Sequence, residues 1–374
     1  MLKTTFPSID LESSALGFGC MRFPTDADGN IIEDEAIRMV RHAIDNGVTY
    51  IDTAYPYHGG KSELLVAKAL KDGYREKVIL ATKLPVWNVE KHEDMMKLLD
   101  EQLEKLQVDC IDFYLMHALN AERLEKLQKL DYKKFLAEAM AQGKIKYPAF
   151  SFHDNYDAFI RILNDYDWKM CQVQMNILDD NNQATLKGIE AAREKGVGVV
   201  VMEPLRGGLL ADPPADVVEL YKSWPVQRSA VDWAFRYLYT MPGVVTILSG
   251  MSTMDQVDDN LRIFDVPAGE VRTAEDDHLY EQVKATYMAR TKTRCTGCQY
   301  CQPCPMGVRI PSIFQGYDVS LLRNSGSFHK GYANIVKDEA DASRCVGCGK
   351  CERACPQHLP IIQYLKEIHA ECAQ

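Results

Sequence analysis

The chain has 374 residues, of which 46% are hydrophobic and 26% charged, a composition typical of a globular protein with one large domain and a smaller one. Its net charge of −10 argues against nucleic acid as a main partner, because phosphate binding requires positive charge. No apolar run reaches the length of a membrane span and the first residues lack the apolar core of a signal peptide, so we expect a cytoplasmic protein with no membrane partner.

Short apolar runs alternate with amphipathic segments over residues 15–265. Strands are expected at 15–23, 49–54, 78–84, 110–117, 145–153, 170–176, 197–203 and 244–250. Helices are expected between them at 33–46, 62–72, 95–106, 122–142, 156–164, 185–195, 229–239 and 254–263. Repeated βα units of this kind predict a closed (β/α)8 TIM barrel. An open doubly wound sheet is the alternative, and the lack of a Gly-x-Gly-x-x-Gly motif after the first strand counts against it.

The composition changes sharply near Cys295, after an expected helix at residues 273–289. We therefore predict two domains, a barrel over residues 1–290 and a small helical domain over residues 291–374. Further helices are expected in the second domain at 310–322, 332–338 and 360–370.

Polar residues stand at the ends of three consecutive apolar strands of the predicted barrel. Asp52 ends the second strand and Tyr57 follows in its loop, Lys83 ends the third, and His117 ends the fourth. Chemistry in such barrels takes place at these strand ends. Asp52 can pair with Lys83, whose ammonium group is expected to lower the pKa of Tyr57, while His117 can orient a carbonyl. Each residue alone is more often structural, but together they favour a catalytic group.

These residues lie in motifs that resemble the aldo-keto reductases over residues 10–265. The motifs are Asp-Thr-Ala-x-x-Tyr at 52–57, Ser-Glu at 62–63, Ala-Thr-Lys at 81–83 and Asp-x-Tyr-Leu-x-His at 112–117. The resemblance implies a catalytic tetrad of Asp52, Tyr57, Lys83 and His117. It implies that Tyr57 donates a proton to a small carbonyl-type substrate while NADP(H) or NAD(H) delivers hydride.

The resemblance also implies a set of cofactor-binding residues: Ser151, Gln174, Asn176, Met202, Pro204, Leu205, Gly207, Gly250, Ser252, Gln256 and Asn260. Three positions depart from the family's pattern. Phe152 stands in place of an asparagine that binds the carboxamide, Met202 in place of a tyrosine that stacks on the nicotinamide, and Gln256 in place of an arginine for the 2′-phosphate. A thioether can pack against a flat ring, so a nicotinamide remains the expected cofactor, with a flavin as the alternative.

Eight of the twelve cysteines fall in two runs near the C-terminus, Cys-x2-Cys-x2-Cys-x2-Cys-Pro from residue 295 and Cys-x2-Cys-x2-Cys-x3-Cys-Pro from residue 345. The second run has the spacing of bacterial [4Fe–4S] ferredoxins, and the first is one residue shorter in its last gap. Together they resemble the helical two-cluster ferredoxin domains of multisubunit reductases. That resemblance implies crossed ligation, with Cys295, Cys298, Cys301 and Cys355 on one cluster and Cys345, Cys348, Cys351 and Cys304 on the other. Zinc is the alternative metal.

The two halves of the chain predict different electron chemistry, because hydride transfer moves two electrons and a [4Fe–4S] cluster moves one. One interpretation is a reductase whose clusters exchange electrons with ferredoxin or flavodoxin, with or without a bound flavin as mediator. A second is a nicotinamide reductase with structural or redox-sensing clusters. A third is a non-enzymatic electron relay in which the barrel is a scaffold, as in channel-associated relatives of the family. The complete tetrad favours an enzyme.

Overall fold

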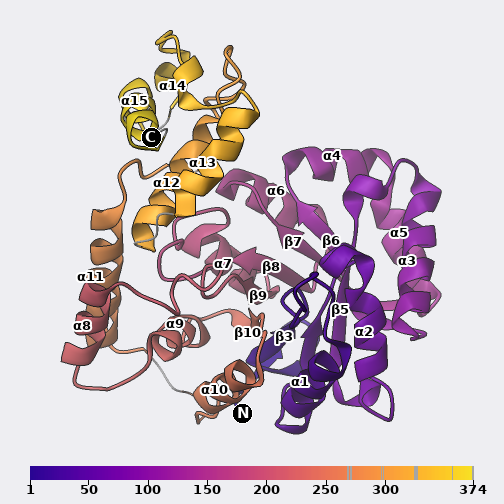
Figure 1. Ribbon diagram of the computed structural model, residues 1–374. Helices are drawn as coiled ribbons and strands as arrows, with labels where there is room; N and C mark the ends of the chain where they lie inside the picture. The colour runs from indigo at the N-terminus through magenta and orange to yellow at the C-terminus, as the bar shows by residue number, and fades with distance from the viewer. Residues whose placement is uncertain are drawn as a thin grey trace. The chain divides into compact units, whose positions relative to one another are not determined.

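The computed structural model describes residues 1–267, 269, 272–295, 297, 299–323, 327–355 and 357–372. The chain divides into two compact units (Figure 1). The first contains Met1–Gly207 and Asp232–Arg272, and the second contains Gly208–Val231 and Thr273–Gln374. The domain boundary expected at residue 290 coincides with the end of helix α11 (Ala274–Arg290), inside the second unit, and stays a prediction.

The first unit is built on a closed barrel of parallel strands in the order β10-β3-β4-β5-β6-β7-β8-β9 (Figure 1). The strands are β3 (Leu16–Gly19), β4 (Tyr50–Asp52), β5 (Ile79–Leu84), β6 (Ile111–Leu119), β7 (Ile145–Phe152), β8 (Met170–Gln174), β9 (Gly198–Met202) and β10 (Val244–Ser249). Each overlaps a segment expected to be a strand. The ring closes where β10 pairs with β3, with Ile247 opposite Leu16. The predicted TIM barrel is therefore confirmed.

Helices follow the strands and cover the barrel: α1 (Glu33–Asp45), α2 (Ser62–Ala69), α3 (His92–Leu106), α4 (Ala121–Lys129), α5 (Tyr132–Ala141), α6 (Tyr156–Asp165), α7 (Thr185–Glu194), α9 (Ala230–Tyr239) and α10 (Met254–Ile263). The single helix expected over residues 122–142 was wrong. Two helices stand there because Asp131 adopts a left-handed φ of 55°, which breaks the helix. No helix in the described part of the chain is both long and apolar enough to cross a bilayer.

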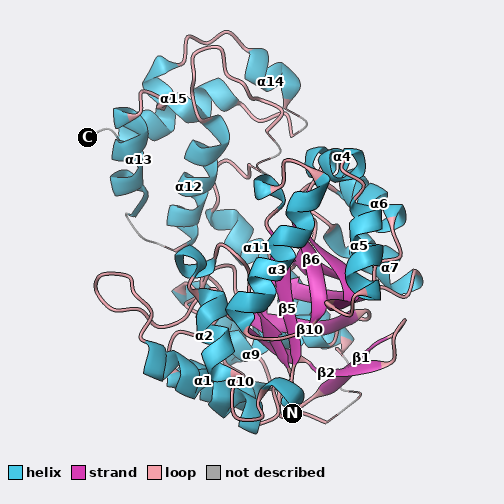
Figure 2. Cartoon of the chain, turned by 90° about the vertical axis from the view of Figure 1, so that its right-hand side faces the viewer, coloured by secondary structure: helices cyan, strands magenta, loops and turns pink. Residues whose placement is uncertain are grey.

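An antiparallel hairpin of β1 (Lys3–Phe6) and β2 (Leu11–Ser14), not expected from the sequence, precedes the barrel (Figure 2). The buried Phe6 ring lies 4.8 Å from the ring of Phe113 and 6.3 Å from that of Tyr50. Thr4 anchors the hairpin by donating a 2.6 Å hydrogen bond to the carbonyl of Val245. Because these residues lie near the starts of their strands, the hairpin closes the N-terminal end of the barrel.

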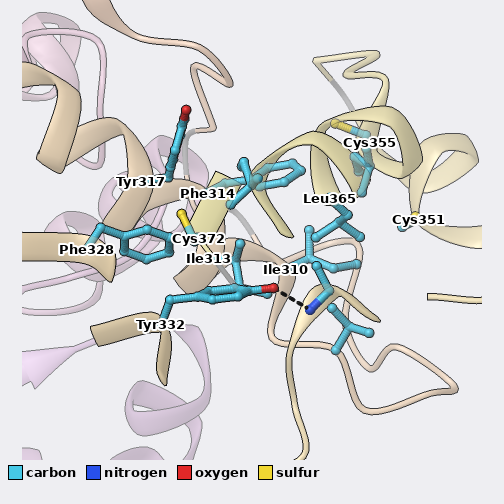
Figure 3. Close-up of a cluster of buried hydrophobic side chains, with 14 residues drawn as sticks. Ile310, Ile313, Phe314, Tyr317, Phe328, Tyr332, Cys351, Cys355, Leu365 and Cys372 are labelled. Carbon is cyan, nitrogen blue, oxygen red and sulfur yellow. Dashed lines mark hydrogen bonds between the residues drawn. The ribbon is translucent and has the colours of Figure 1, made fainter. Parts of the chain in front are cut away.

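The second unit is helical, as expected for residues 291–374. It contains α8 (Ala215–Ser223), α11, α12 (Ile310–Leu322), α13 (Ser327–Lys337), η4 (Ala342–Arg344), α14 (Lys350–Ala354) and α15 (Ile361–Cys372). Its apolar core packs Ile313, Phe314 and Leu365 around buried Tyr332, whose hydroxyl accepts a 3.1 Å hydrogen bond from the amide of Ala342 (Figure 3). The core also includes Cys351, Cys355 and Cys372, so two of the predicted cluster ligands are part of the packing of this unit.

Candidate active site and cysteine centres

The four predicted catalytic residues are carried by three neighbouring strands and the loop after the first of them. Asp52 is the last residue of β4, and Tyr57 begins the short η1 helix (Tyr57–Gly60) that follows. Lys83 lies in β5 and His117 in β6. The pairing of Asp52 with Ala81 and of Lys83 with Leu115 aligns these strands so that the polar residues gather at one end of the barrel. This is the end where TIM barrels carry their chemistry.

Lys83 is the centre of the polar group. Its Nζ donates hydrogen bonds to Asp52 Oδ2 at 2.7 Å and to the carbonyl oxygen of Thr53 at 2.8 Å, and it lies 3.4 Å from the hydroxyl oxygen of Tyr57. The side chains of Lys83 and Asp52 are 1% and 3% exposed. Burial alone would lower the pKa of Lys83, but Asp52 and Tyr57 outweigh burial and raise it. The ammonium form of Lys83 is therefore held beside the phenol.

The expectation that Lys83 lowers the pKa of Tyr57 below its ordinary value was wrong. Burial of the phenol raises the pKa of Tyr57 by more than Lys83 lowers it, and the carboxylate of Asp52 raises it further. Tyr57 is consequently a neutral phenol over the physiological pH range. A neutral phenol keeps its proton available for donation, and the nearby ammonium group is placed to stabilise the phenolate that donation would leave.

His117 is the fourth member of the group and lies beside Tyr57. The two rings lie edge to face with centroids 6.3 Å apart, and the ring of Trp87 lies 5.0 Å from that of His117. Burial, followed by the charge of Lys83, lowers the pKa of His117 to about 2. Its Nδ1 is buried without a hydrogen-bond partner among the described residues. His117 is thus a neutral imidazole, able to donate or accept one hydrogen bond at a substrate oxygen.

The sequence reasoning missed Gln172, which supports Asp52 from across the barrel. Gln172 lies in β8, the strand opposite β4 in the ring, and its Nε2 donates a 3.0 Å hydrogen bond to Asp52 Oδ1. Asp52 is therefore held through both carboxylate oxygens, one by Lys83 and one by Gln172. The available signal was a glutamine between the apolar residues Cys171 and Val173 in the middle of the strand, because a buried amide needs a partner.

A second buried network lies behind Lys83 and includes Glu63, a residue of the Ser-Glu motif. Glu63 Oε1 accepts hydrogen bonds from Thr82 Oγ1 at 2.7 Å and Gln102 Nε2 at 2.6 Å. Gln102 Nε2 also lies 3.1 Å from the carbonyl oxygen of Lys83, and Gln102 Oε1 accepts a 2.7 Å bond from the hydroxyl of Tyr114. Burial raises the pKa of Glu63. The network connects α2 and α3 to β5 and fixes the backbone that carries Lys83.

The predicted cofactor residues of β7 and β8 stand near the same end of the barrel, and they already have partners. Ser151 Oγ accepts a 2.7 Å hydrogen bond from the amide of Ala118, next to His117. Gln174 Nε2 and Asn176 Nδ2 both donate to Asp179 Oδ2, at 3.1 and 3.0 Å. Asn176 Oδ1 also accepts hydrogen bonds from the backbone amides of residues 178 and 179, so the side chain of Asn176 stabilises the loop after β8. As cofactor contacts these residues stay predictions.

The remaining predicted cofactor residues follow β9 and β10. Met202 ends β9, and Pro204, Leu205 and Gly207 form the turn after it. Gly250 follows β10 directly, where an added Cβ would come within 2.7 Å of the side chain of Arg22. Ser252, Gln256 and Asn260 each already make a hydrogen bond. The backbone amide of Ser252 donates a 2.8 Å hydrogen bond to Gln256 Oε1, and Asn260 Nδ2 donates a 2.8 Å hydrogen bond to Ser249 Oγ. Gln256 is exposed near the first turn of α10, and Phe152 is buried.

Seven described cysteines of the two runs line two hollows that share Cys301. Cys304, Cys345, Cys348 and Cys351 line one of them together with Cys301. Cys295, Cys301 and Cys355 line the other. Cys304 thus stands with the second run of cysteines and Cys355 with the first, the arrangement that crossed ligation requires. Cys298 lies outside the described residues.

Thiol donors on the walls of two apolar hollows fit iron–sulfur clusters, which are held by cysteine thiolates. The predicted ligand sets assign Cys295, Cys298, Cys301 and Cys355 to one cluster and Cys304, Cys345, Cys348 and Cys351 to the other. Within the described ranges no three His, Cys, Asp or Glu side chains stand close enough to hold a single metal ion.

Two family models match the chain. One, described as the aldo/keto reductase family, matches residues 15–279, and another, described as a 4Fe-4S dicluster domain, matches residues 294–359. The second match favours iron–sulfur clusters over the zinc alternative.

Individual proteins with similar sequence or structure were also found, two of which carry aldo-keto reductase names and one of which is named a dehydrogenase. The chain is 29% identical over 210 residues to "Probable aldo-keto reductase 1" of Glycine max, a match that spans 53% of this chain and 57% of that protein. It is 28% identical over 276 residues to L-galactose dehydrogenase of Arabidopsis thaliana, spanning 67% of this chain and 84% of that protein. The structure of aldo-keto reductase AKR11C1 from Bacillus halodurans (holo form) matches with a TM-score of 0.64 and 28% identity over 76% of this chain and 96% of that one. Because the first family model covers well over half of the sequence, the protein belongs to the aldo/keto reductase family, and it carries a 4Fe-4S dicluster domain after its barrel.

Proposed function

We propose that this protein is an NAD(P)H-dependent reductase of a small carbonyl-type substrate, with Tyr57 as the proton donor and two [4Fe–4S] clusters that exchange electrons with a one-electron carrier. The observation that carries the proposal is the contact of Lys83 with both Asp52 and Tyr57 at a single buried point, 2.7 and 3.4 Å away. Burying a charged lysine costs free energy, and a barrel that served only as a scaffold would have no need for such a lysine beside a phenol.

The proposed chemistry at the barrel site is the addition of hydride and proton to a carbonyl. A nicotinamide, when bound, would supply the hydride to the carbonyl carbon. Tyr57 gives its proton to the carbonyl oxygen, and the alcohol product forms. Lys83 stabilises the phenolate left behind, and solvent restores the proton to Tyr57. His117, neutral and beside Tyr57, holds the carbonyl oxygen by a hydrogen bond before the proton moves.

The nicotinamide is proposed to lie across the ends of β7 to β10. Ser151 and Gln174 would contact its carboxamide, and Met202 would pack against its ring. The residues of the turn after β9 and of the first turn of α10 would contact the phosphates and the adenosine. Gln256 carries no positive charge for a 2′-phosphate, so both NADH and NADPH are candidates. A flavin bound in the same space is the alternative cofactor.

The proposed clusters give the protein a one-electron partner, for which ferredoxin or flavodoxin is the candidate. An alternative is a structural or redox-sensing role in which the clusters exchange no electrons during turnover. Anaerobic addition of NADH or NADPH distinguishes these functions. Bleaching of the cluster absorbance would show that electrons reach the clusters from the nicotinamide, and unchanged absorbance would favour the structural or sensing role.

The test of the proposed function uses anaerobically purified full-length protein with NADPH or NADH and a panel of aldehydes, ketones, quinones and enones. The expected result is nucleotide oxidation matched one to one by the reduced product. Extraction of the same preparation identifies any nicotinamide or flavin that it carries. Failure of every carbonyl substrate with both nucleotides, together with release of a flavin, would overturn the proposal in favour of flavin chemistry.

A further inference from the structure

The cysteines that line the two hollows differ in their exposure to solvent. Cys348 is exposed, whereas Cys295, Cys301, Cys304 and Cys345 are partly buried and Cys351 and Cys355 are buried. Among the described cysteines of the two hollows, Cys348 is thus the one exposed to solvent. Electron exchange with another protein weakens steeply with distance, so a carrier that docks over Cys348 would come close to the cluster that Cys348 is predicted to ligate.

Basic and apolar side chains surround Cys348. Arg344 and Lys350 are exposed on either side of it in the sequence, and Val346 between them is 65% exposed. Arg353, one turn further along α14, lies 3.5 Å from the carbonyl oxygen of Cys348. We call the surface made by Arg344, Val346, Cys348, Lys350 and Arg353 the Cys348 face. Figures 1 and 2 both place α14 at the opposite end of the second unit from α11.

Two acidic residues, Glu339 and Glu352, accompany the three basic side chains of this surface. Glu339 lies 3.4 Å from Arg344, but its side chain is 81% exposed, so solvent weakens the attraction. Glu352 accepts a 2.9 Å hydrogen bond from the amide of Ile362 at the start of α15. No carboxylate of the described residues lies within ion-pair distance of Lys350. The Cys348 face therefore has three basic side chains against two nearby carboxylates, an excess of positive charge, with an exposed apolar residue within it.

The net charge of the C-terminal part of the chain, which carries this surface, is opposite in sign to that of the rest of the chain. Residues 291–374 contain 10 Lys and Arg and 7 Asp and Glu, a net charge of +3, whereas the net charge of residues 1–290 is −13. An acidic protein is repelled by the larger part of the chain and attracted to the smaller part. Complementary charge of this kind raises the rate of association and orients weak complexes.

We propose that the Cys348 face is the docking surface for an acidic one-electron carrier protein. The inference rests on the proposed function, because it assumes that clusters occupy the two hollows. In the exchange the reduced carrier loses one electron and the cluster site at Cys304, Cys345, Cys348 and Cys351 gains it, with no bond made or broken. Redox complexes of this type bury small interfaces and dissociate quickly. Arg344 and Lys350 supply the attraction, and Val346 supplies apolar contact next to the exposed thiol.

The test measures binding rather than turnover. The cluster-loaded wild type is titrated with a purified acidic ferredoxin, in calorimetry at low and at physiological ionic strength. The variant Arg344→Glu/Lys350→Glu is compared with Lys330→Glu/Lys337→Glu, which reverses two exposed charges on α13 of the same unit. The dissociation constant is expected to rise at least about tenfold in the first variant and to stay within about twofold of the wild type in the second. Added salt should weaken wild-type binding.

Val346→Asp provides a second variant that leaves the charged residues and the cysteines in place. It should weaken binding by a similar factor, with the iron content of every variant measured as a control. Equal loss of affinity in the α13 variant, no loss in the Cys348-face variants, or tighter binding of the wild type to anionic vesicles than to the ferredoxin would each overturn the proposal. Carbonyl reduction by NAD(P)H is assayed separately, so its failure with binding intact would contradict the proposed function alone.

Discussion

The ammonium nitrogen of Lys83 lies 3.4 Å from the hydroxyl oxygen of Tyr57 and 4.9 Å from the centre of its ring. This contact joins a lysine whose pKa is raised, which favours its charged form, to a phenol whose pKa is raised by burial. The ammonium group has little effect on the neutral phenol and a large effect on the phenolate. Lys83 is therefore placed to stabilise Tyr57 after it has lost a proton, which is a property of a proton donor rather than of a structural ion pair.

The first prediction concerns pH. Carbonyl reduction should be nearly constant between about pH 6 and 9, because Tyr57 stays protonated and His117 stays neutral throughout. Since the pKa of Tyr57 is raised, activity should fall only as the pH rises above the ordinary tyrosine value of about 10. The measurement is kcat/KM against pH in saturating nucleotide. A decline centred near neutral pH would contradict the assigned protonation states.

The second prediction concerns the buried ion pair. Lys83→Met leaves the carboxylate of Asp52, 3% exposed, without its charged partner. Removing one member of a buried pair costs about 3–5 kcal/mol, so thermal unfolding should begin about 10 °C lower than in the wild type. The double variant Asp52→Asn/Lys83→Met should recover part of the loss because it buries no charge. An unchanged unfolding temperature in the single variant would mean that the pair is not buried in the protein.

The third prediction concerns Gln172. Gln172→Met removes the hydrogen bond to Asp52 Oδ1 and preserves most of the side-chain volume. Asp52 would then be fixed through one oxygen, and kcat should fall by about tenfold with KM nearly unchanged, the loss expected for one hydrogen bond to a charged group. Steady-state kinetics check this. If kcat is unaffected, Gln172 supports packing and does not position Asp52.

The fourth prediction tests crossed ligation of the clusters. In this arrangement Cys304 and Cys345 serve one cluster, while Cys355 serves the other. The variant Cys304→Ala/Cys345→Ala should therefore keep about four of about eight iron atoms, and Cys345→Ala/Cys355→Ala should keep almost none. Uncrossed ligation predicts the reverse order. Cys372→Ala, a buried cysteine outside both runs, controls for general loosening of the unit.

The fold was largely predictable from the sequence because each strand is a short apolar run and each helix buries a regular apolar face. In α1, for example, the buried residues Ala36, Met39, Val40 and Ala43 recur at helical spacing. The hairpin of β1 and β2 escaped prediction because its strands are only four residues long and three of the four residues in each are polar. The break at Asp131 also escaped, since the residues on both sides favour helix and only the left-handed backbone separates α4 from α5.

Most residues of the site could be predicted from the sequence, but the direction of their pKa shifts could not. The strand ends placed Asp52, Lys83 and His117 near one another, because parallel strands of a barrel share one end. The direction of the pKa shift of Tyr57 was not predictable, since it depends on burial of the phenol, which the sequence does not contain. The hydrogen bond from Gln172 to Asp52 joins residues 120 positions apart in the sequence. It could not be predicted because it forms only when the barrel closes and brings β8 opposite β4.

The most direct test of the account is the rate of carbonyl reduction by Tyr57→Phe, a change that removes the proton donor and leaves the ring. We expect kcat/KM to fall at least about 100-fold, because the variant lacks the hydroxyl that gives its proton to the carbonyl oxygen beside Lys83. Iron content and unfolding temperature should match those of the wild type, since the hydroxyl of Tyr57 makes only the 3.4 Å contact with Lys83 among the described residues. Turnover equal to that of the wild type would contradict the assignment of Tyr57 as proton donor and with it the proposed mechanism.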